Sequence, residues 1–110
     1  MRGHGGEIER RRSHRMHVAL PMEIKVYTAS QQPIVTTSIA TNISESGIFA
    51  EYLDLDAAEK IEAIDSLEGK KAQIHIFPSA HFPGEFDVMG IIRRKVVDGK
   101  QLGIGIEFVA

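Results

Sequence analysis

Residues 18–26 read VALPMEIKV, and apolar side chains occupy every second position of this stretch. The alternating apolar residues are Val18, Leu20, Met22, Ile24 and Val26. Because successive side chains of a strand point to opposite faces, this period predicts a β-strand with one buried face. Pro21 has no backbone N–H to donate to a neighbouring strand, so we expect the strand to lie at a sheet edge or to carry a bulge there.

The same two-residue period recurs along the rest of the chain. It is found over residues 35–43, 48–52, 72–76, 86–92 and 102–108, and in the first of these Val35, Thr37, Ile39, Thr41 and Ile43 are expected to share one face. Turn residues separate the segments, and Asp98-Gly99 is a strong hairpin signal. Six short strands predict a mainly β, antiparallel barrel or sandwich, and closure into a barrel is favoured because it removes exposed strand edges.

One short helix is expected after the third strand, over about residues 56–68. Asp56 followed by Glu59 fits a capping box in acidic form, and Gly69 suits the helix exit. The apolar residues that fall near one helical face are Ala57, Ile61, Ile64 and Leu67. The outward side of this acidic helix is a candidate surface for a partner.

Length and composition limit the classes of protein. The chain has 110 residues, which predicts one domain, and it has no cysteine, which excludes disulfides and thiolate zinc sites and fits a reducing compartment. No apolar run approaches the roughly 18 residues that span a bilayer. The opening residues MRGHGGEIERRR lack the apolar stretch of a secretory signal, so we expect a cytoplasmic location.

Catalytic and metal-binding patterns are not evident. Of the five histidines only His14 and His17 are close in sequence, and on an extended segment this spacing points them to opposite faces. The serines lack the GxSxG pattern of a hydrolase nucleophile, and no carboxylate pair stands out. We therefore expect neither enzymatic activity nor a metal or other cofactor.

Positive charge is concentrated near the start, where residues 9–15 read ERRRSHR. Residues 1–15 hold five arginines against two glutamates, although the whole chain carries a formal charge of -2. Such a run is commonly a solvated tail. It also suits a small anionic ligand, which needs only a local cluster of charge, whereas DNA or RNA needs a broad basic face.

The second polar motif follows the predicted second strand, where residues 42–47 read NISESG. The Asn42 amide can both donate to and accept from a nucleobase edge, and Ser44 adds a hydroxyl two residues later. Gly47 can adopt a positive φ, so we expect a tight loop with backbone N–H groups turned toward an anion. An ordinary polar hairpin loop is the alternative interpretation.

Together these motifs resemble those of the PilZ domain family. Arg11-x-x-x-Arg15, preceded by Arg10, is similar to the family's RxxxR motif, and Asn42-x-Ser44-x-x-Gly47 is similar to its (D/N)xSxxG motif. Residues 103–109, GIGIEFV, are similar to the family's last barrel strand. The resemblance implies a six-stranded antiparallel PilZ-type β-barrel over residues 10–110. Residues 1–9 are glycine-rich and have little to pack, so we expect them to form a flexible lead-in.

The resemblance also implies a ligand, the bacterial second messenger cyclic di-GMP. Arg11 and Arg15 would bind guanine edges and phosphates, and Asn42, Ser44 and Gly47 would bind from the barrel side. Arg10 is the residue that the family associates with a stacked ligand dimer. Ligand binding would order residues 9–15 over the barrel, and this change would signal to an effector protein.

Two alternatives remain open. The first is a PilZ-fold adaptor that binds a protein and no nucleotide, although the arginines argue against it. The second is a small barrel that binds RNA or DNA, which needs aromatic side chains interleaved with basic ones. Aromatic residues make up only 6% of the chain, and residues 93–95, RRK, are the one other basic run. We therefore expect no nucleic-acid partner.

Overall fold

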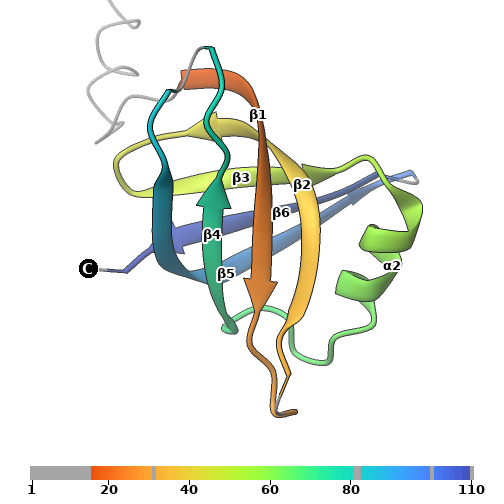
Figure 1. Cartoon of the computed structure of the whole chain (residues 1–110). Coiled ribbons are helices and arrows are strands. Elements are labelled where there is room, and N and C mark those ends of the chain that lie inside the picture. Colours follow the sequence, from red (N-terminus) through yellow and green to blue (C-terminus); the bar gives the residue numbers. More distant parts are fainter. Residues whose placement is uncertain (1–15, 31, 81–82, 100, 110) are drawn as a thin grey trace, which may run out of the picture.

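The structure is a computed structural model that describes residues 16–30, 32–80, 83–99 and 101–109. Six strands and one helix are present in this part of the chain (Figure 1). The strands are β1 Met16–Val26, β2 Ile34–Ile43, β3 Gly47–Tyr52, β4 Lys71–Ile76, β5 Phe86–Asp98 and β6 Gln101–Phe108. The helix α2, Leu55–Glu62, connects β3 to β4.

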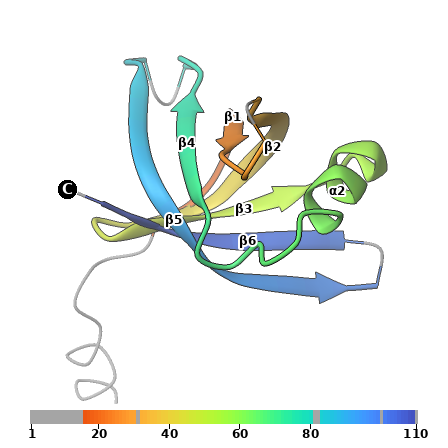
Figure 2. The same ribbon diagram turned by 90° about the horizontal axis from the view of Figure 1, so that it is seen from below.

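The strands close into a barrel in the order β1-β2-β3-β6-β5-β4, and every neighbouring pair is antiparallel. Seen from below, α2 lies to one side of the barrel, near the ends of β3 and β6 (Figure 2). The predicted six-stranded, mainly β barrel with one helix after the third strand is confirmed.

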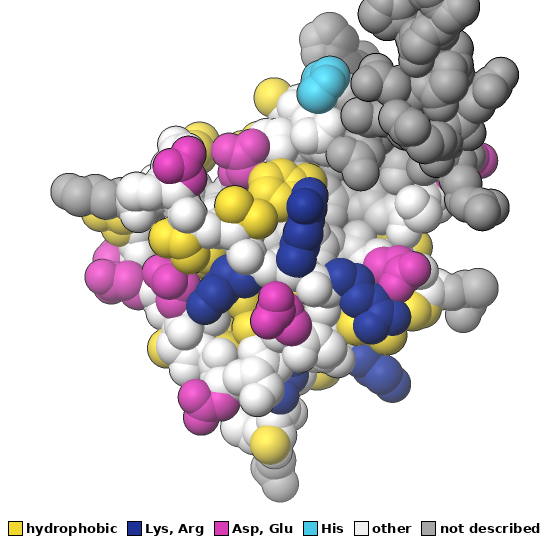
Figure 3. Space-filling model, turned by 180° about the vertical axis from the view of Figure 1, so that it is seen from behind, with side chains coloured by type: hydrophobic (Ala, Val, Ile, Leu, Met, Phe, Trp, Pro, Cys, Tyr) yellow, Lys and Arg dark blue, Asp and Glu magenta, His cyan; other side chains and the backbone are white. Residues whose placement is uncertain are grey.

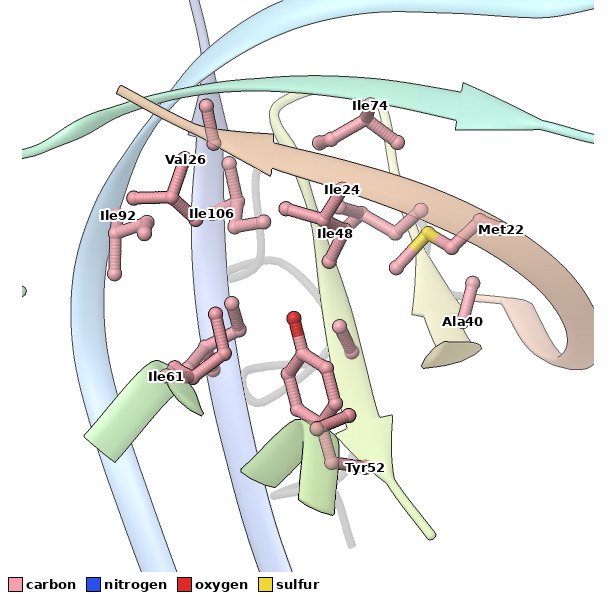
Figure 4. Packing of buried hydrophobic residues seen from close by; sticks show 14 of the residues in the cluster. Met22, Ile24, Val26, Ala40, Ile48, Tyr52, Ile61, Ile74, Ile92 and Ile106 are labelled. Atoms are coloured by element: carbon pink, nitrogen blue, oxygen red, sulfur yellow. The ribbon is translucent and has the colours of Figure 1, made fainter. Parts of the chain in front are cut away.

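The alternating residues of β1 fill the barrel interior, as their period predicts. Leu20, Met22, Ile24 and Val26 are buried, and they join side chains from the other strands in one cluster (Figure 4). Ile61 of α2 is fully buried and belongs to the same cluster together with Ala57 and Ala58, so the helix packs on the barrel through these side chains. Full burial of such a side chain contributes roughly 1.5–3 kcal/mol, so this cluster is the main source of stability.

β1 is not an edge strand, contrary to one of the two arrangements expected from Pro21. It pairs with β2 on one side and with β4 on the other. The ladder with β4 runs from Val26 to Met22, so Pro21 lies one residue beyond it and its missing N–H removes no bond from that ladder. The register irregularity of β1 lies just before Pro21, between His17 and Leu20.

The interior face of β2 carries small and polar side chains. Thr36, Ser38 and Ala40 are buried, whereas Val35 is 44% exposed. The predicted shared face is therefore the outer one for Val35, Thr37 and Ile39, whereas beyond the bulge of β2 Ile43 packs against the core. The reason lies in the neighbouring strand β3, where the Tyr52 hydroxyl is hydrogen-bonded to the Thr36 hydroxyl at 2.7 Å.

The helix is shorter than expected and begins earlier. It spans Leu55–Glu62, and its N-cap is Asp54, whose side chain accepts a hydrogen bond from the Asp56 N–H at 3.1 Å. The predicted capping box of Asp56 and Glu59 is therefore wrong, because the helix is capped by Asp54. Beyond the helix, Leu67 is still buried, and Ser66 adopts a left-handed φ of 54° as the chain turns toward β4.

Burial raises the pKa of Tyr52 from 10.0 to about 12, and the hydrogen bond to Thr36 offsets part of this rise. The free energy of unfolding should therefore fall between about pH 10 and pH 12, where Tyr52 ionises in the unfolded chain but not in the folded one. At about 1.4 kcal/mol per pKa unit, this group alone accounts for a loss approaching about 3 kcal/mol.

Urea denaturation of wild type and Tyr52→Phe at several pH values measures this loss. Near neutral pH the variant should be less stable by about 1 kcal/mol, because Thr36 loses its hydrogen-bond partner. Above pH 10 the difference should shrink and then reverse, since phenylalanine does not ionise. A difference that stays constant with pH would show that Tyr52 is not protected from ionisation.

Candidate functional site

Asn42 is brought to the barrel surface by an irregularity in β2. The β2–β3 register shifts between Ala40 and Asn42, which makes Thr41 an extra residue and pairs Asn42 with Phe49 of β3. Such bulges bend a strand and redirect its side chains. Asn42 consequently lies at the rim of a pocket, next to the hairpin loop that joins β2 to β3.

The hairpin loop is folded around the Ser44 hydroxyl. This oxygen accepts hydrogen bonds from the N–H groups of Ser46 and Gly47, both at 3.3 Å. The Ser44 N–H in turn donates to the Gly47 carbonyl at 2.9 Å. Ser44 therefore holds the loop in shape, and its own O–H proton is left to turn toward Gly47, Ser46 or a ligand.

Gly47 is required for a reason other than the one expected. Its φ is not positive, since among the described glycines only Gly69 and Gly99 have positive φ. A side chain at position 47 would collide with the backbone carbonyl oxygen of Ile106, because β6 approaches β3 closely there. The requirement is one of space, and a backbone oxygen cannot move aside as a flexible side chain can.

The loop borders a pocket of about 450 Å³. The pocket lies outside the barrel wall, where the β2–β3 loop meets β3, β5 and β6. Its lining residues are Asn42, Ile43, Ser44, Ser46, Gly47, Ile48, Phe49, Arg93, Arg94, Gly105, Ile106 and Glu107. All three of the predicted barrel-side residues are therefore brought together at one cavity.

Two arginines of β5 line the same pocket, and the sequence did not single them out for this site. The β5–β6 register shifts between Ile92 and Arg94, so Arg93 is an extra residue in β5. In a regular strand two adjacent side chains would point to opposite faces. The bulge instead allows both Arg93 and Arg94 to reach the pocket.

Arg94 is positioned by an aromatic ring and two glycines. Its guanidinium carbon lies 5.3 Å from the centroid of the Phe49 ring, within the range of a cation–π contact. The missing side chains of Gly103 and Gly105 leave the space that the Phe49 ring and the Arg94 side chain occupy. One face of the guanidinium is thereby held while the pocket side stays open.

Arg93 has a different partner. Its Nε–H donates to a carboxylate oxygen of Glu107 at 2.7 Å. Viewed from behind, the molecule shows acidic side chains lying between basic ones on this face (Figure 3). The pocket thus carries two arginines and one carboxylate from the described residues.

Three of the predicted site residues, Arg10, Arg11 and Arg15, lie outside the described residues. The other three, Asn42, Ser44 and Gly47, line the pocket. The residues that sequence reasoning missed are Phe49, Arg93, Arg94 and Glu107. The signal available for the two arginines is that residues 93–95, RRK, form a second basic run and interrupt the apolar alternation of β5.

Other site types find little support in the part of the chain that the structure describes. It contains no group of three histidine or acidic side chains arranged to hold a metal ion. Among these same residues, no helix has the length and apolar character needed to cross a membrane.

A family model for the PilZ domain matches residues 9–110. The chain belongs to the PilZ domain family. The matched range includes both the arginine-rich segment and the whole barrel, as the resemblance of the two motifs predicted. No curated protein matches this PilZ domain in sequence.

Two solved structures illustrate the shared fold. The Bacillus subtilis inhibitor of motility (MotI/DgrA) is similar over 92% of this chain, with a TM-score of 0.64 and 18% identity. This chain covers 43% of that protein, less than half of its length. The PilZ domain of YcgR from Escherichia coli with c-di-GMP is similar over 91% of this chain and 78% of its own, with a TM-score of 0.61 and 21% identity. At these identities the likeness shows the barrel fold alone.

The close approach of β6 to β3 can be tested at Gly47. We expect Gly47→Ala to lower the free energy of unfolding by about 1–3 kcal/mol, because the added methyl group must displace backbone. Gly84→Ala is the matched control, since nothing lies within 4 Å of a side chain added there. The control should change stability by less than about 0.5 kcal/mol. Equal effects in chemical denaturation would contradict a steric role for Gly47.

Proposed function

We propose that this PilZ domain is a receptor for cyclic di-GMP and binds it in the pocket beside Asn42, Ser44 and Gly47. The observation that carries the proposal is that one cavity gathers the loop motif and two arginines of β5. The chain also enters the barrel at this place, because His17 of β1 pairs with Asn42. Arg15 precedes His17 by two residues in sequence, and two residues of extended chain span about 7 Å, which supports a role for Arg15 at this pocket.

The chemistry of the ligand supports the same site. Cyclic di-GMP offers two phosphates and two guanines. Arginine donates in parallel to guanine O6 and N7, stacks on purines and binds phosphate through two donors, whereas lysine is a point charge. The Asn42 amide suits the donors and acceptors of a base edge. Arg94, with its guanidinium held against Phe49, suits stacking on a base.

In the proposed mechanism the segment 9–15 closes over the occupied pocket, with Arg11 and Arg15 on the ligand. Closure changes the surface that an effector protein meets, so ligand binding and effector binding are coupled. The domain acts by binding and carries out no reaction. Arg10 is the residue expected to matter if two stacked ligand molecules bind, which the stoichiometry of a titration reveals.

Calorimetric titration with cyclic di-GMP tests the receptor proposal. Wild type should bind, and Arg11→Ala or Arg15→Ala should weaken binding by about 1.5–3 kcal/mol, which is the range for a hydrogen bond to a charged group. Arg12→Ala removes the same charge from the same segment and should change affinity much less. Arg15→Lys should also bind poorly, because lysine lacks the two parallel donors.

Two different results would contradict the proposal, and each has its own meaning. Wild type that gives no heat at high ligand concentration would favour the adaptor that binds no nucleotide. Arginine variants with normal affinity would place the ligand elsewhere on the barrel.

Arg94 provides a test of the barrel-side half of the site. We expect Arg94→Ala to weaken cyclic di-GMP binding by about tenfold or more, through loss of a charged, stacked contact. Lys95→Ala is the matched control, because Lys95 is an exposed neighbour of equal charge that does not line the pocket. The β5–β6 ladder pairs Lys95 with the buried Ile104, so Lys95 lies on the face of the ladder opposite to that of Arg94. Equal losses in the two variants would mean that only overall charge matters.

A further inference from the structure

Glu107 is a carboxylate inside a pocket that we propose to bind an anion. It lies on β6 between the two halves of the site, opposite Gly47 of β3 and opposite Ile91 of β5. No described residue other than Arg93 forms an ion pair with it, and this is the one pair between an arginine or lysine and a carboxylate in the described part of the chain. Its position therefore needs an explanation beyond general surface charge.

The pair is placed by the same features that build the pocket. The β5 bulge adds Arg93 after Ile92, two residues from the Ile91 that pairs with Glu107, and the Arg93 guanidinium reaches the carboxylate in the neighbouring strand. The missing side chain of Gly47 leaves the other flank of Glu107 free of a cross-strand neighbour. Both side chains are a little more than half exposed, 56% for Arg93 and 53% for Glu107, so a ligand can reach either one.

Glu107 occupies the Nε–H donor of Arg93. A guanidinium presents that donor and its terminal N–H groups in one plane, and a phosphate that binds in the two-donor mode needs two of them side by side. An anion that takes the Nε–H must therefore displace the carboxylate. Of the two arginines in the pocket, Arg94 has an aromatic partner that does not compete for its N–H donors, whereas Arg93 has a partner that does.

We propose that Glu107 is an internal competitor for the ligand, which holds Arg93 in the empty site and is exchanged for a ligand phosphate on binding. This inference rests on the proposed function. It adds a residue that lowers affinity and so sets the ligand concentration at which the receptor responds. Because the pair is exposed to solvent, its loss should leave the barrel stable and act mainly on binding.

The test is a double-mutant cycle in calorimetric titrations with cyclic di-GMP, at about 0.3 M salt to screen distant charges. Glu107→Gln keeps the side-chain shape and should tighten binding about threefold to tenfold. Glu51→Gln is the matched control, because Glu51 lies opposite Gly103 on the neighbouring strand and does not line the pocket. It should change affinity by less than about twofold.

The second half of the cycle separates competition from simple repulsion. In an Arg93→Ala background the gain from Glu107→Gln should fall below about twofold, because no donor is left to release. A gain that persists there would mean that the carboxylate only repels the ligand, and would overturn the exchange. Unchanged or weaker binding by Glu107→Gln alone would overturn it too.

An NMR measurement reads the exchange directly and does not depend on the affinity of the Arg93→Ala variant. The Arg93 Nε–H resonance, assigned by its loss in that variant, should move in ligand-free Glu107→Gln and should move in wild type on saturation with cyclic di-GMP. A resonance that saturation leaves in place would show that Arg93 keeps its carboxylate. Wild type that does not bind the ligand at all would instead remove the receptor proposal, and this inference with it.

Discussion

Closure of the six-stranded ladder is the constraint on which both the core and the site depend. A sheet of so few strands must coil strongly before β1 can pair with β4, and the strands achieve this with register irregularities in β1, β2 and β5. Each irregularity bends its strand and redirects the side chains beside it. In β2 and β5 the redirected residues are Asn42, Arg93 and Arg94, which all line one pocket. The local distortions in this closed wall thus coincide with its candidate binding surface.

Much of the fold could be predicted wherever period and turn chemistry agree. The alternation in β1 gave the correct buried face, and Asp98-Gly99 forms a turn in which Gly99 has a φ of 63°. The face of β2 could not be obtained in this way, because it is decided by a contact between strands. Tyr52 brings a hydroxyl into the core, and an unpaired buried hydroxyl is costly, so Thr36 faces inward to bond it. No pattern within β2 contains that information.

The candidate site likewise contains residues that local sequence could identify and residues that only contacts between strands explain. Asn42, Ser44 and Gly47 could be identified by spacing because they belong to one hairpin, whose loop is held by local hydrogen bonds to Ser44. The reason why position 47 needs glycine could not be predicted from spacing, because it depends on the carbonyl of Ile106, which is distant in sequence. Arg93 and Arg94 could not be predicted as a pair, because a regular strand would point them to opposite faces and only the bulge brings both to the pocket. The roles of Arg10, Arg11 and Arg15 stay predictions, since these residues lie outside the described part of the chain.

The distribution of charge supports the proposed small anionic ligand over a nucleic acid. Exposed charges further apart than about 8 Å hardly interact at physiological salt, so a polyanion needs basic side chains repeated along its path. On the face seen in Figure 3, acidic side chains lie between the basic ones. A ligand the size of a dinucleotide can contact Arg93, Arg94 and the loop at Asn42 without crossing further carboxylates than Glu107. Selection by size thus follows from where the carboxylates lie, as much as from where the arginines do.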